Sequence, residues 1–542
     1  MSKEAVVSFT ITAVLATALS VFWRQRIDSV LPAPYLDEVF HVRQAQAYWQ
    51  GRWREWDPKI TTPPGLYVLS IGVMRLASYA LPYVVEGFTA DFRATNGLVV
   101  FNLLQLRLRR LLHRVRGEYR PSKICAWELN WTAMNICLFP PIFFFSGLYY
   151  TDIAALLFVI EAYWQDLQQG ATTTVWGSFK LIAIGLMSLC FRQTNIIWVV
   201  VFVGGLKALR VLKSKTTECR STDMARIAKG SWQLHQLYDP PARSASMLDY
   251  LYSILSIILN ALLNVPAILK AIIPHLVVLS AFGAFVLWNG SIVLGHKEFH
   301  TAQIHLPQIL YIWPYSMFFS WPLFVVPFAV RLYEGVKTKQ PHLICKSLPG
   351  VLVSVGITLI MGAVVHFNTI VHPFTLADNR HYVFYVFRIL FRHPAIRYLA
   401  APVYFVCACA ALSTLSGTWT KDLTTMTGAE EPTRDSKSVS IPAEGEVTVS
   451  FILIWLAATT LTLVTAPLVE PRYFIIPWVL WRLHVPPPPI DNKSPQARIL
   501  RNIPYLLETI WYMIVNAAVG YMFLYKGFEW PQEPGVVQRF MW

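Results

Sequence analysis

The sequence predicts an all-α polytopic membrane protein, and three observations lead to that class. The chain of 542 residues is 55% hydrophobic and only 14% charged, whereas soluble proteins carry about a quarter charged residues. Many of its apolar runs approach the roughly 20 residues that a spanning helix needs. Lys and Arg gather in blocks between those runs, as in the cytoplasmic loops of membrane proteins. The net charge of +15 therefore indicates topology, and we expect no nucleic-acid partner.

The N-terminal apolar run is the first predicted span. It begins like a signal peptide, but no small-residue cleavage site follows, and Trp23, Arg24 and Arg26 flank its end. These features favour an uncleaved transmembrane helix.

The apolar runs together predict about 12–14 transmembrane helices. We place them at 4–23, 91–110, 124–145, 152–166, 178–191, 195–212, 271–289, 308–332, 350–370, 398–416, 447–467, 472–485 and 503–525.

Three basic blocks orient these spans. They lie at 107–123, 207–243 and 337–346, and all three should be cytoplasmic. The N-terminus is then cytoplasmic as well, as are a basic loop at 213–247 and a polar linker at 416–446. The composition of that linker is typical of disorder. We treat residues 1–542 as one integral membrane domain.

Two further apolar segments are predicted to lie along the membrane edge. If 65–84 spanned fully, the first basic block would move to the non-cytoplasmic side. Its central Arg75 would also cost roughly 2.5–3.5 kcal/mol at mid-bilayer. The same reasoning applies to 382–397, which contains three Arg residues. We therefore expect an edge helix in each segment, the first of them within a first non-cytoplasmic loop at 24–90. The alternative, that both segments span, stays open.

Adjacent carboxylates open that first loop. Pro34 suits a helix start, and a helix over 35–48 would place Asp37, His41, Gln44 and Tyr48 on one face. Glu38 would lie on a neighbouring face, so the two acids should have different roles. The alternative is a pair of acids that favour a helix dipole. Ionisable groups at membrane depth are costly and therefore indicate function.

Hydrogen-bond donors collect on the same side of the membrane. The candidates for binding an anionic group or a sugar are Lys59, Arg192, Lys297, His300, Asn379, Arg380, His381 and Arg472. With few matching acids, such an excess of donors suits a phosphate. The alternative for each Arg is snorkelling at the interface. The spacing of His296 and His300 lacks a third ligand, so we predict no metal site.

Several segments carry a resemblance to a known family. They are YLDEVFHVRQAQAYW, WDPKITTPPGLY, FRQTN, GHKEFHTAQIHLPQ, HPFTLADNRHYVFYVFR and EPRYFIIPW. Together they resemble the dolichyl-phosphate-glucose-dependent α-1,2-glucosyltransferases of the endoplasmic reticulum, which belong to the GT-C class. The resemblance extends over nearly the whole chain, apart from the cytoplasmic linkers.

The resemblance implies a substrate pair and a location. The donor would be dolichyl phosphate glucose, and the acceptor a dolichyl-diphosphate oligosaccharide that already bears two glucoses. The enzyme would be a multi-pass protein of the endoplasmic reticulum membrane with a luminal active site and no cofactor. An inverting displacement needs a base, for which we choose Asp37. Glu38, His41 and Gln44 would position sugar hydroxyls. The candidates to hold the lipid phosphate are Arg192, Arg380, His381 and Arg472.

Two other functions stay open from the residues alone. The chain could be a transporter or a membrane protein that modulates a channel, although its polar groups gather at one membrane face. It could also be a GT-C enzyme that uses dolichyl phosphate mannose.

Overall fold

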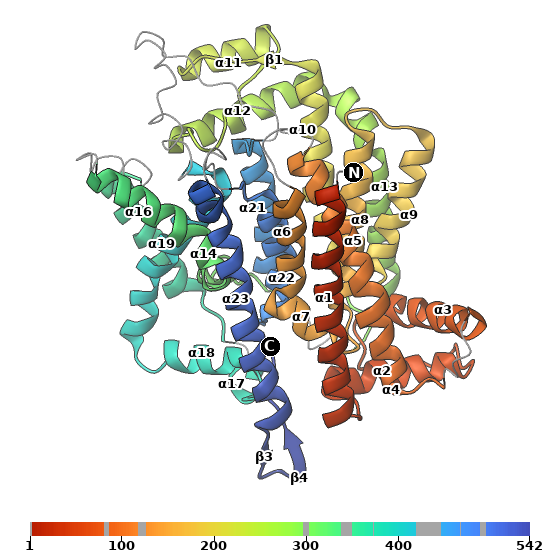
Figure 1. Cartoon of the computed structure of the whole chain (residues 1–542). Helices are drawn as coiled ribbons and strands as arrows, with labels where there is room; N and C mark the ends of the chain where they lie inside the picture. The colour runs from red at the N-terminus through yellow and green to blue at the C-terminus, as the bar shows by residue number, and fades with distance from the viewer. Residues whose placement is uncertain are drawn as a thin grey trace.

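The structure, a computed structural model, is built almost entirely from helices (Figure 1). It describes residues 3–80, 86–117, 126–295, 297, 303–337, 349–371, 373–418, 446–466, 468–487 and 495–542. Named strands within these ranges are limited to two short pairs. The predicted class, an all-α polytopic membrane protein, is confirmed.

Six described helices are long and apolar enough to cross a membrane. They are α1 (Lys3–Val30), α13 (Val265–Asn289), α14 (Gln308–Lys337), α16 (Val351–Asn368), α19 (Pro394–Ser416) and α23 (Pro495–Tyr525). Each corresponds to a predicted span. In Figure 1, α6 (Ala126–Leu138) packs between α1 and α23.

The other predicted spans correspond to shorter or composite helices. They are α4 (Thr89–Ala94) with η1 (Thr95–Val100), α5 (Phe101–Leu112) and η2 (His113–Gly117); α6 with α7 (Pro140–Ser146); α8 (Asp152–Gln169); α9 (Val175–Leu189); η3 (Ile197–Val203) with α10 (Gly204–Lys215); α21 (Val449–Val464); and η6 (Pro471–Phe474) with α22 (Ile475–His484). The predicted span 124–145 is broken at Phe139, whose ψ is 123°. The break follows from Pro140 and Pro141, because a residue before proline avoids the helical region.

A small layer at one end of the bundle was not predicted. It comprises β1 (Thr217–Glu218), α11 (Met224–Gln233), β2 (Gln236–Leu237) and α12 (Met247–Leu263). Helix α12 buries its polar side, where Ser256 Oγ bonds Ser231 Oγ at 2.8 Å and Asn260 Nδ2 donates to Gln236 O at 2.9 Å. Its apolar residues, such as Leu251 and Leu262, are exposed. This inverted pattern explains why hydropathy did not reveal the helix as part of a folded layer.

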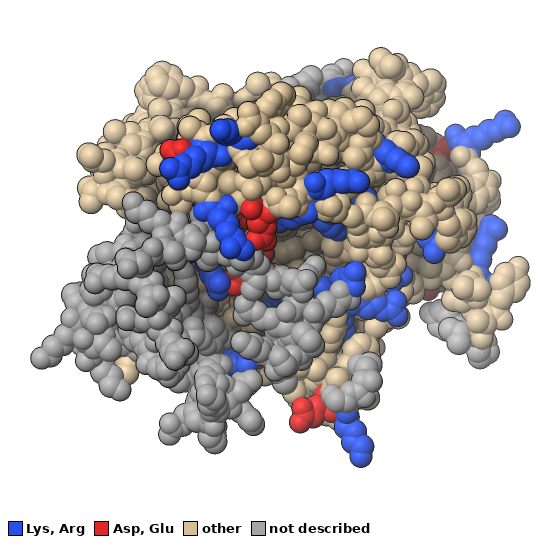
Figure 2. Space-filling model, turned by 90° about the horizontal axis from the view of Figure 1, so that it is seen from above, with Lys and Arg blue, Asp and Glu red and all other residues tan. Residues whose placement is uncertain are grey.

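Lys and Arg side chains gather on the face that carries this layer, as Figure 2 shows from above. Lys213 and Lys215 lie in the last turn of α10, which leads into the layer. The segment 213–247, predicted as a basic loop, therefore holds short folded elements. Most of the predicted linker 416–446 lies outside the described residues.

Helices that lie across the bundle collect at the opposite end. They are α2 (Asp37–Trp49), α3 (Gly65–Ala80), α17 (Pro373–Ala377) and α18 (Tyr382–Leu390). In Figure 1, α3 and α18 run across the direction of α1, the orientation predicted for edge helices. Helix α18 is shorter than the edge helix predicted at 382–397, because α19 already begins at Pro394.

The last described residues form a hairpin at this same end (Figure 1). Strand β3 (Phe528–Trp530) pairs antiparallel with β4 (Glu533–Gln538) after α23. We call residues 528–542 the arm. This hairpin was not predicted from the sequence.

Gly65 is a point where α3 touches the bundle closely. Its amide donates to Cys190 O at 3.0 Å, and a Cβ at Gly65 would lie 2.5 Å from that same oxygen. Gly72, in the same helix, has nothing within 4 Å of such a Cβ.

We therefore expect Gly65→Ala to destabilise the fold by about 1–3 kcal/mol, the usual cost of overpacking. Gly72→Ala is the matched control and should be neutral or stabilising by up to about 1 kcal/mol, because Ala favours helix. Thermal unfolding of the purified protein in detergent measures both. Equal melting temperatures for the two variants would contradict the close approach of α3 to Cys190.

Candidate active site

A cavity of about 610 Å³ opens between the crossing helices and the arm. Its polar and aromatic lining residues include Asp37, Tyr150, Asp378, Arg380, His381, Glu470, Arg472, Trp530 and Trp542. They come from the start of α2, the turn before α8, the junction of α17 and α18, the segment before α22, and the arm. Four of the predicted site residues therefore meet here: Asp37, Arg380, His381 and Arg472.

The start of α2 sends its two acids in different directions. Leu36, just before the helix, has φ 54° and ψ −128°, a strained conformation for a residue with a side chain. The side chain of Asp37 is 46% exposed and lines the cavity, whereas that of Glu38 is fully buried. The prediction that the two acids have separate roles agrees with this arrangement.

Glu38 is held by four hydrogen bonds inside the protein. Its Oε1 accepts from Arg93 Nε at 2.8 Å and from Tyr149 N at 2.8 Å. Its Oε2 accepts from Arg93 Nη2 at 2.6 Å and from Tyr35 N at 3.2 Å. Both carboxylate oxygens are thus occupied away from the cavity. This differs from the predicted contact with a sugar, and the geometry indicates that Glu38 fastens α2 to α4.

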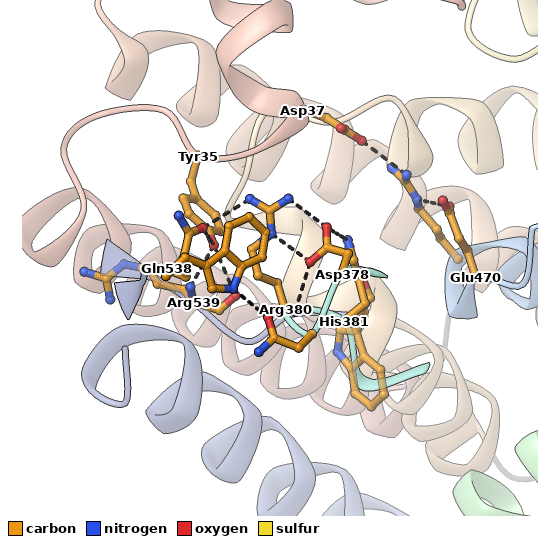
Figure 3. Close-up of polar contacts among 12 residues, drawn as sticks. Tyr35, Asp37, Asp378, Arg380, His381, Glu470, Gln538 and Arg539 are labelled. Atoms are coloured by element: carbon orange, nitrogen blue, oxygen red, sulfur yellow. Dashed lines mark hydrogen bonds and ion pairs between the residues drawn. The ribbon is translucent and has the colours of Figure 1, made fainter. Parts of the chain in front are cut away.

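Asp37 is instead part of an ion-pair chain on the cavity wall (Figure 3). Arg472 Nη2 lies 3.2 Å from Asp37 Oδ2, and Arg472 Nε donates to Glu470 Oε2 at 2.6 Å. Burial alone would raise the pKa of Asp37, but Arg472, His41 and His381 outweigh it and lower this pKa below 3.8. Asp37 is therefore ionised at neutral pH and can accept a proton.

His41 and Gln44, also on the predicted polar face of α2, form hydrogen bonds within the protein. His41 Nδ1 lies 2.7 Å from the hydroxyl of Tyr67, and burial lowers the pKa of His41 despite the opposing effect of Asp37. Gln44 Nε2 donates to Glu55 O at 2.7 Å. Neither His41 nor Gln44 lines the cavity, so among the predicted stripe only Asp37 reaches it.

A second ion pair lies on the other side of the cavity. Arg380 binds Asp378 through two hydrogen bonds of 2.8 and 2.7 Å. Its guanidinium also lies 4.5 Å from the ring centroid of Trp530. Asn379 Oδ1 accepts from Trp530 Nε1 at 2.8 Å. Asn379 therefore holds Trp530, a residue of the cavity wall, rather than facing a ligand.

The other predicted cations do not meet at the cavity. Arg192 Nη2 lies 3.1 Å from Asp152 Oδ1, Lys59 lies 5.1 Å from the ring of Phe40, and Lys297 donates to Asn289 O. None of these three cations lines the cavity. His300 lies outside the described residues.

The predicted excess of unmatched donors was wrong. Arg192, Arg380 and Arg472 each have a carboxylate partner. Glu470 and Asp378 could have been assigned from the sequence, because both arginines of the cavity follow an acid at the spacing acid-x-Arg. Arg93, Tyr35 and the arm carried no such signal. Among the described residues, no three His, Cys, Asp or Glu side chains lie together as metal ligands would.

Comparison with known proteins adds a family to this geometry. The model of the DIE2/ALG10 family matches residues 31–483. A relative from Emericella nidulans is 46% identical over 590 residues, covering 96% of each chain. A relative from Rattus norvegicus is 30% identical, covering 99% of this chain and 97% of its own. No solved structure matches.

Both relatives are named Dol-P-Glc:Glc(2)Man(9)GlcNAc(2)-PP-Dol alpha-1,2-glucosyltransferase. The family match contains Asp37, Glu38, Arg93, Arg380 and Arg472, and it ends before the arm. The chain belongs to the DIE2/ALG10 family.

Proposed function

We propose that this protein transfers glucose in α-1,2 linkage from dolichyl phosphate glucose to a dolichyl-diphosphate oligosaccharide that bears two glucoses. The product carries the third, terminal glucose. One structural observation carries the proposal: an ionised carboxylate, Asp37, faces a cavity of about 610 Å³ that also holds two arginines. The name of the near-full-length relatives specifies the sugar and the acceptor.

The chemistry is an inverting single displacement. Asp37 accepts the proton of the acceptor hydroxyl as the oxygen bonds to C1 of glucose. The bond between C1 and the phosphate oxygen breaks, and its electron pair leaves with dolichyl phosphate. Arg380 and Arg472 stabilise the charge that develops on that phosphate. The leaving phosphate needs no proton, and this displacement requires neither a metal nor another cofactor.

The ion pairs suit this task because they are already formed. Arg472 is held by Glu470 and Asp37, and Arg380 by Asp378. Charges fixed before the reaction cost little reorganisation in the transition state.

The location proposed is the endoplasmic reticulum membrane, with the cavity facing the lumen. Lys and Arg gather on the end that carries α11 and α12, opposite the cavity (Figure 2). Such an end faces the cytoplasm in most membrane proteins. Multiple apolar helices support a multi-pass arrangement in the bilayer.

The sugar is tested by offering purified protein each dolichyl-phosphate sugar with a diglucosylated lipid-linked acceptor. We expect transfer from dolichyl phosphate glucose and none from dolichyl phosphate mannose. Mass spectrometry of the oligosaccharide measures the added hexose and its linkage. Transfer of mannose alone would overturn the donor assignment, and substrate flux into liposomes without any transfer would favour a transporter.

The two adjacent acids are separated by paired amide substitutions. Asp37→Asn should abolish transfer without changing the melting temperature, because Asp37 is half exposed in the cavity. Glu38→Gln should lower stability by about 3–5 kcal/mol, because it breaks the fully buried ion pair with Arg93 and leaves only Asp28, at 3.2 Å, as its charged partner. Transfer kinetics and thermal unfolding of both variants measure these effects. The opposite pattern, with a stable but inactive Glu38→Gln, would make Glu38 the reacting acid.

The pH dependence follows from the lowered pKa of Asp37. Only the ionised form accepts a proton, so protonation should slow transfer as pH falls through this pKa, which lies below 3.8. We therefore expect a flat single-turnover rate from about pH 7.5 down to about pH 5.5. An acid limb with a midpoint near pH 6.5 in the wild-type protein would contradict this prediction, because a carboxylate whose pKa lies below 3.8 stays ionised at that pH.

A further inference from the structure

The arm forms one wall of the cavity although it lies beyond the family match. Trp530, Met541 and Trp542 all line the cavity. The arm follows α23 and folds back across the cavity end of the bundle (Figure 1).

Backbone hydrogen bonds join the arm to the segment that carries Arg380. Met541 N donates to Arg380 O at 2.9 Å, and Tyr382 N donates to Met541 O at 3.2 Å. His381 and Met541 thereby form an isolated parallel β-bridge. The position of the Arg380 backbone is therefore set in part by the arm.

The arm also joins this segment to the start of α2 (Figure 3). Arg539 N donates to the hydroxyl of Tyr35 at 2.7 Å. Tyr35 lies two residues before Asp37 and donates its own amide to Glu38. One connected set of hydrogen bonds thus runs from the Asp37 side of the cavity to the Arg380 side.

Gln538 is the side chain of the arm that holds the Arg380 guanidinium. It is 1% exposed. Its Oε1 accepts from Arg380 Nη1 at 3.1 Å, and its Nε2 donates to Glu533 Oε2 at 2.7 Å. The donation to Glu533 turns the amide oxygen toward Arg380.

These contacts fix the plane of the guanidinium. A guanidinium has five N–H groups; Asp378 takes two of them and Gln538 a third. These three bonds do not use the second N–H of either terminal nitrogen, and Trp530 lies against the group at 4.5 Å. Two N–H groups side by side match two oxygens of a phosphate.

We propose that the arm belongs to the active site and that Gln538 is a positioning residue, which orients Arg380 toward the phosphate of the lipid donor. The inference rests on the proposed function, since it deepens the role of Arg380 in donor binding. The arm, which lies outside the family match, would then take part in donor binding.

The test compares five variants with the full-length wild-type protein, the fifth being Gln538→Met combined with Arg380→Ala. Gln538→Met keeps the side-chain volume and removes the hydrogen bonds to Arg380 and Glu533, together with a long one of 3.5 Å from the hydroxyl of Tyr35. Gln538→Glu combined with Glu533→Gln exchanges the amide and the carboxylate, so that a hydrogen bond to Arg380 and one between positions 538 and 533 can both form again. Arg380→Ala removes the positioned group, and Val536→Ala, whose side chain is 51% exposed in the same strand, is the control.

We expect Gln538→Met to raise the donor KM about 10-fold, the usual consequence of losing a hydrogen bond to a charged group, with little change in melting temperature. The exchanged double variant should restore the donor KM, and Val536→Ala should not alter it. Adding Gln538→Met to Arg380→Ala should have no further effect, because Gln538 acts through Arg380. An unchanged donor KM in Gln538→Met, or fully additive effects, would overturn the inference.

A measurement without substrate separates this inference from the proposed function. Hydrogen exchange of the amides at 378–382 should be faster in Gln538→Met than in wild type or Val536→Ala. If the wild-type protein transfers no glucose, the proposed function fails, while faster exchange still supports the positioning role of Gln538. Equal exchange in all variants overturns that role whatever the enzyme transfers.

Discussion

The buried ion pair between Glu38 and Arg93 is the interaction on which the cavity depends. Both side chains are fully buried, and an unpaired charge at either position would cost several kcal/mol. The pair fastens the first turn of α2 to α4, and Arg93 also reaches Asp28 and the carbonyl of Leu31. With Glu38 held in this way, the neighbouring Asp37 must project in another direction, which is the cavity. The strained backbone of Leu36 persists because these contacts determine it from both sides.

The charged residues around the cavity occur as acid–arginine pairs. Arg380 and Arg472 each follow an acid two residues earlier, and each uses that acid to fix its guanidinium. Asp37 is shared with Arg472, so the group that would accept a proton touches a group that would stabilise the leaving phosphate. Because these charges are partly compensated, the cavity keeps ionised groups of both signs without a large excess of either. That balance suits a reaction in which a proton leaves the acceptor hydroxyl while the phosphate leaves C1 of the donor glucose.

Sequence patterns predicted the features that depend on local chain properties. Long apolar runs located α1, α13 and α23, and the central arginine of 65–84 indicated that α3 would not cross with them. Helical spacing separated Asp37 from Glu38. The partner of Glu38 was out of reach, because Arg93 lies 55 residues away and no periodicity links the two. The arm was missed for the same reason, and α12 because it exposes its apolar side and buries its serines and asparagine.

The central claim is that Asp37 faces the reacting sugar while Glu38 remains inside the protein. An experimental structure of the protein with an unreactive donor analogue and the lipid-linked acceptor would test it most directly. The account predicts the Asp37 carboxylate within about 2.6–3.2 Å of the acceptor hydroxyl, with Glu38 still bound to Arg93. A structure in which Glu38 leaves Arg93 to contact the acceptor, or in which Asp37 points away from it, would contradict the account.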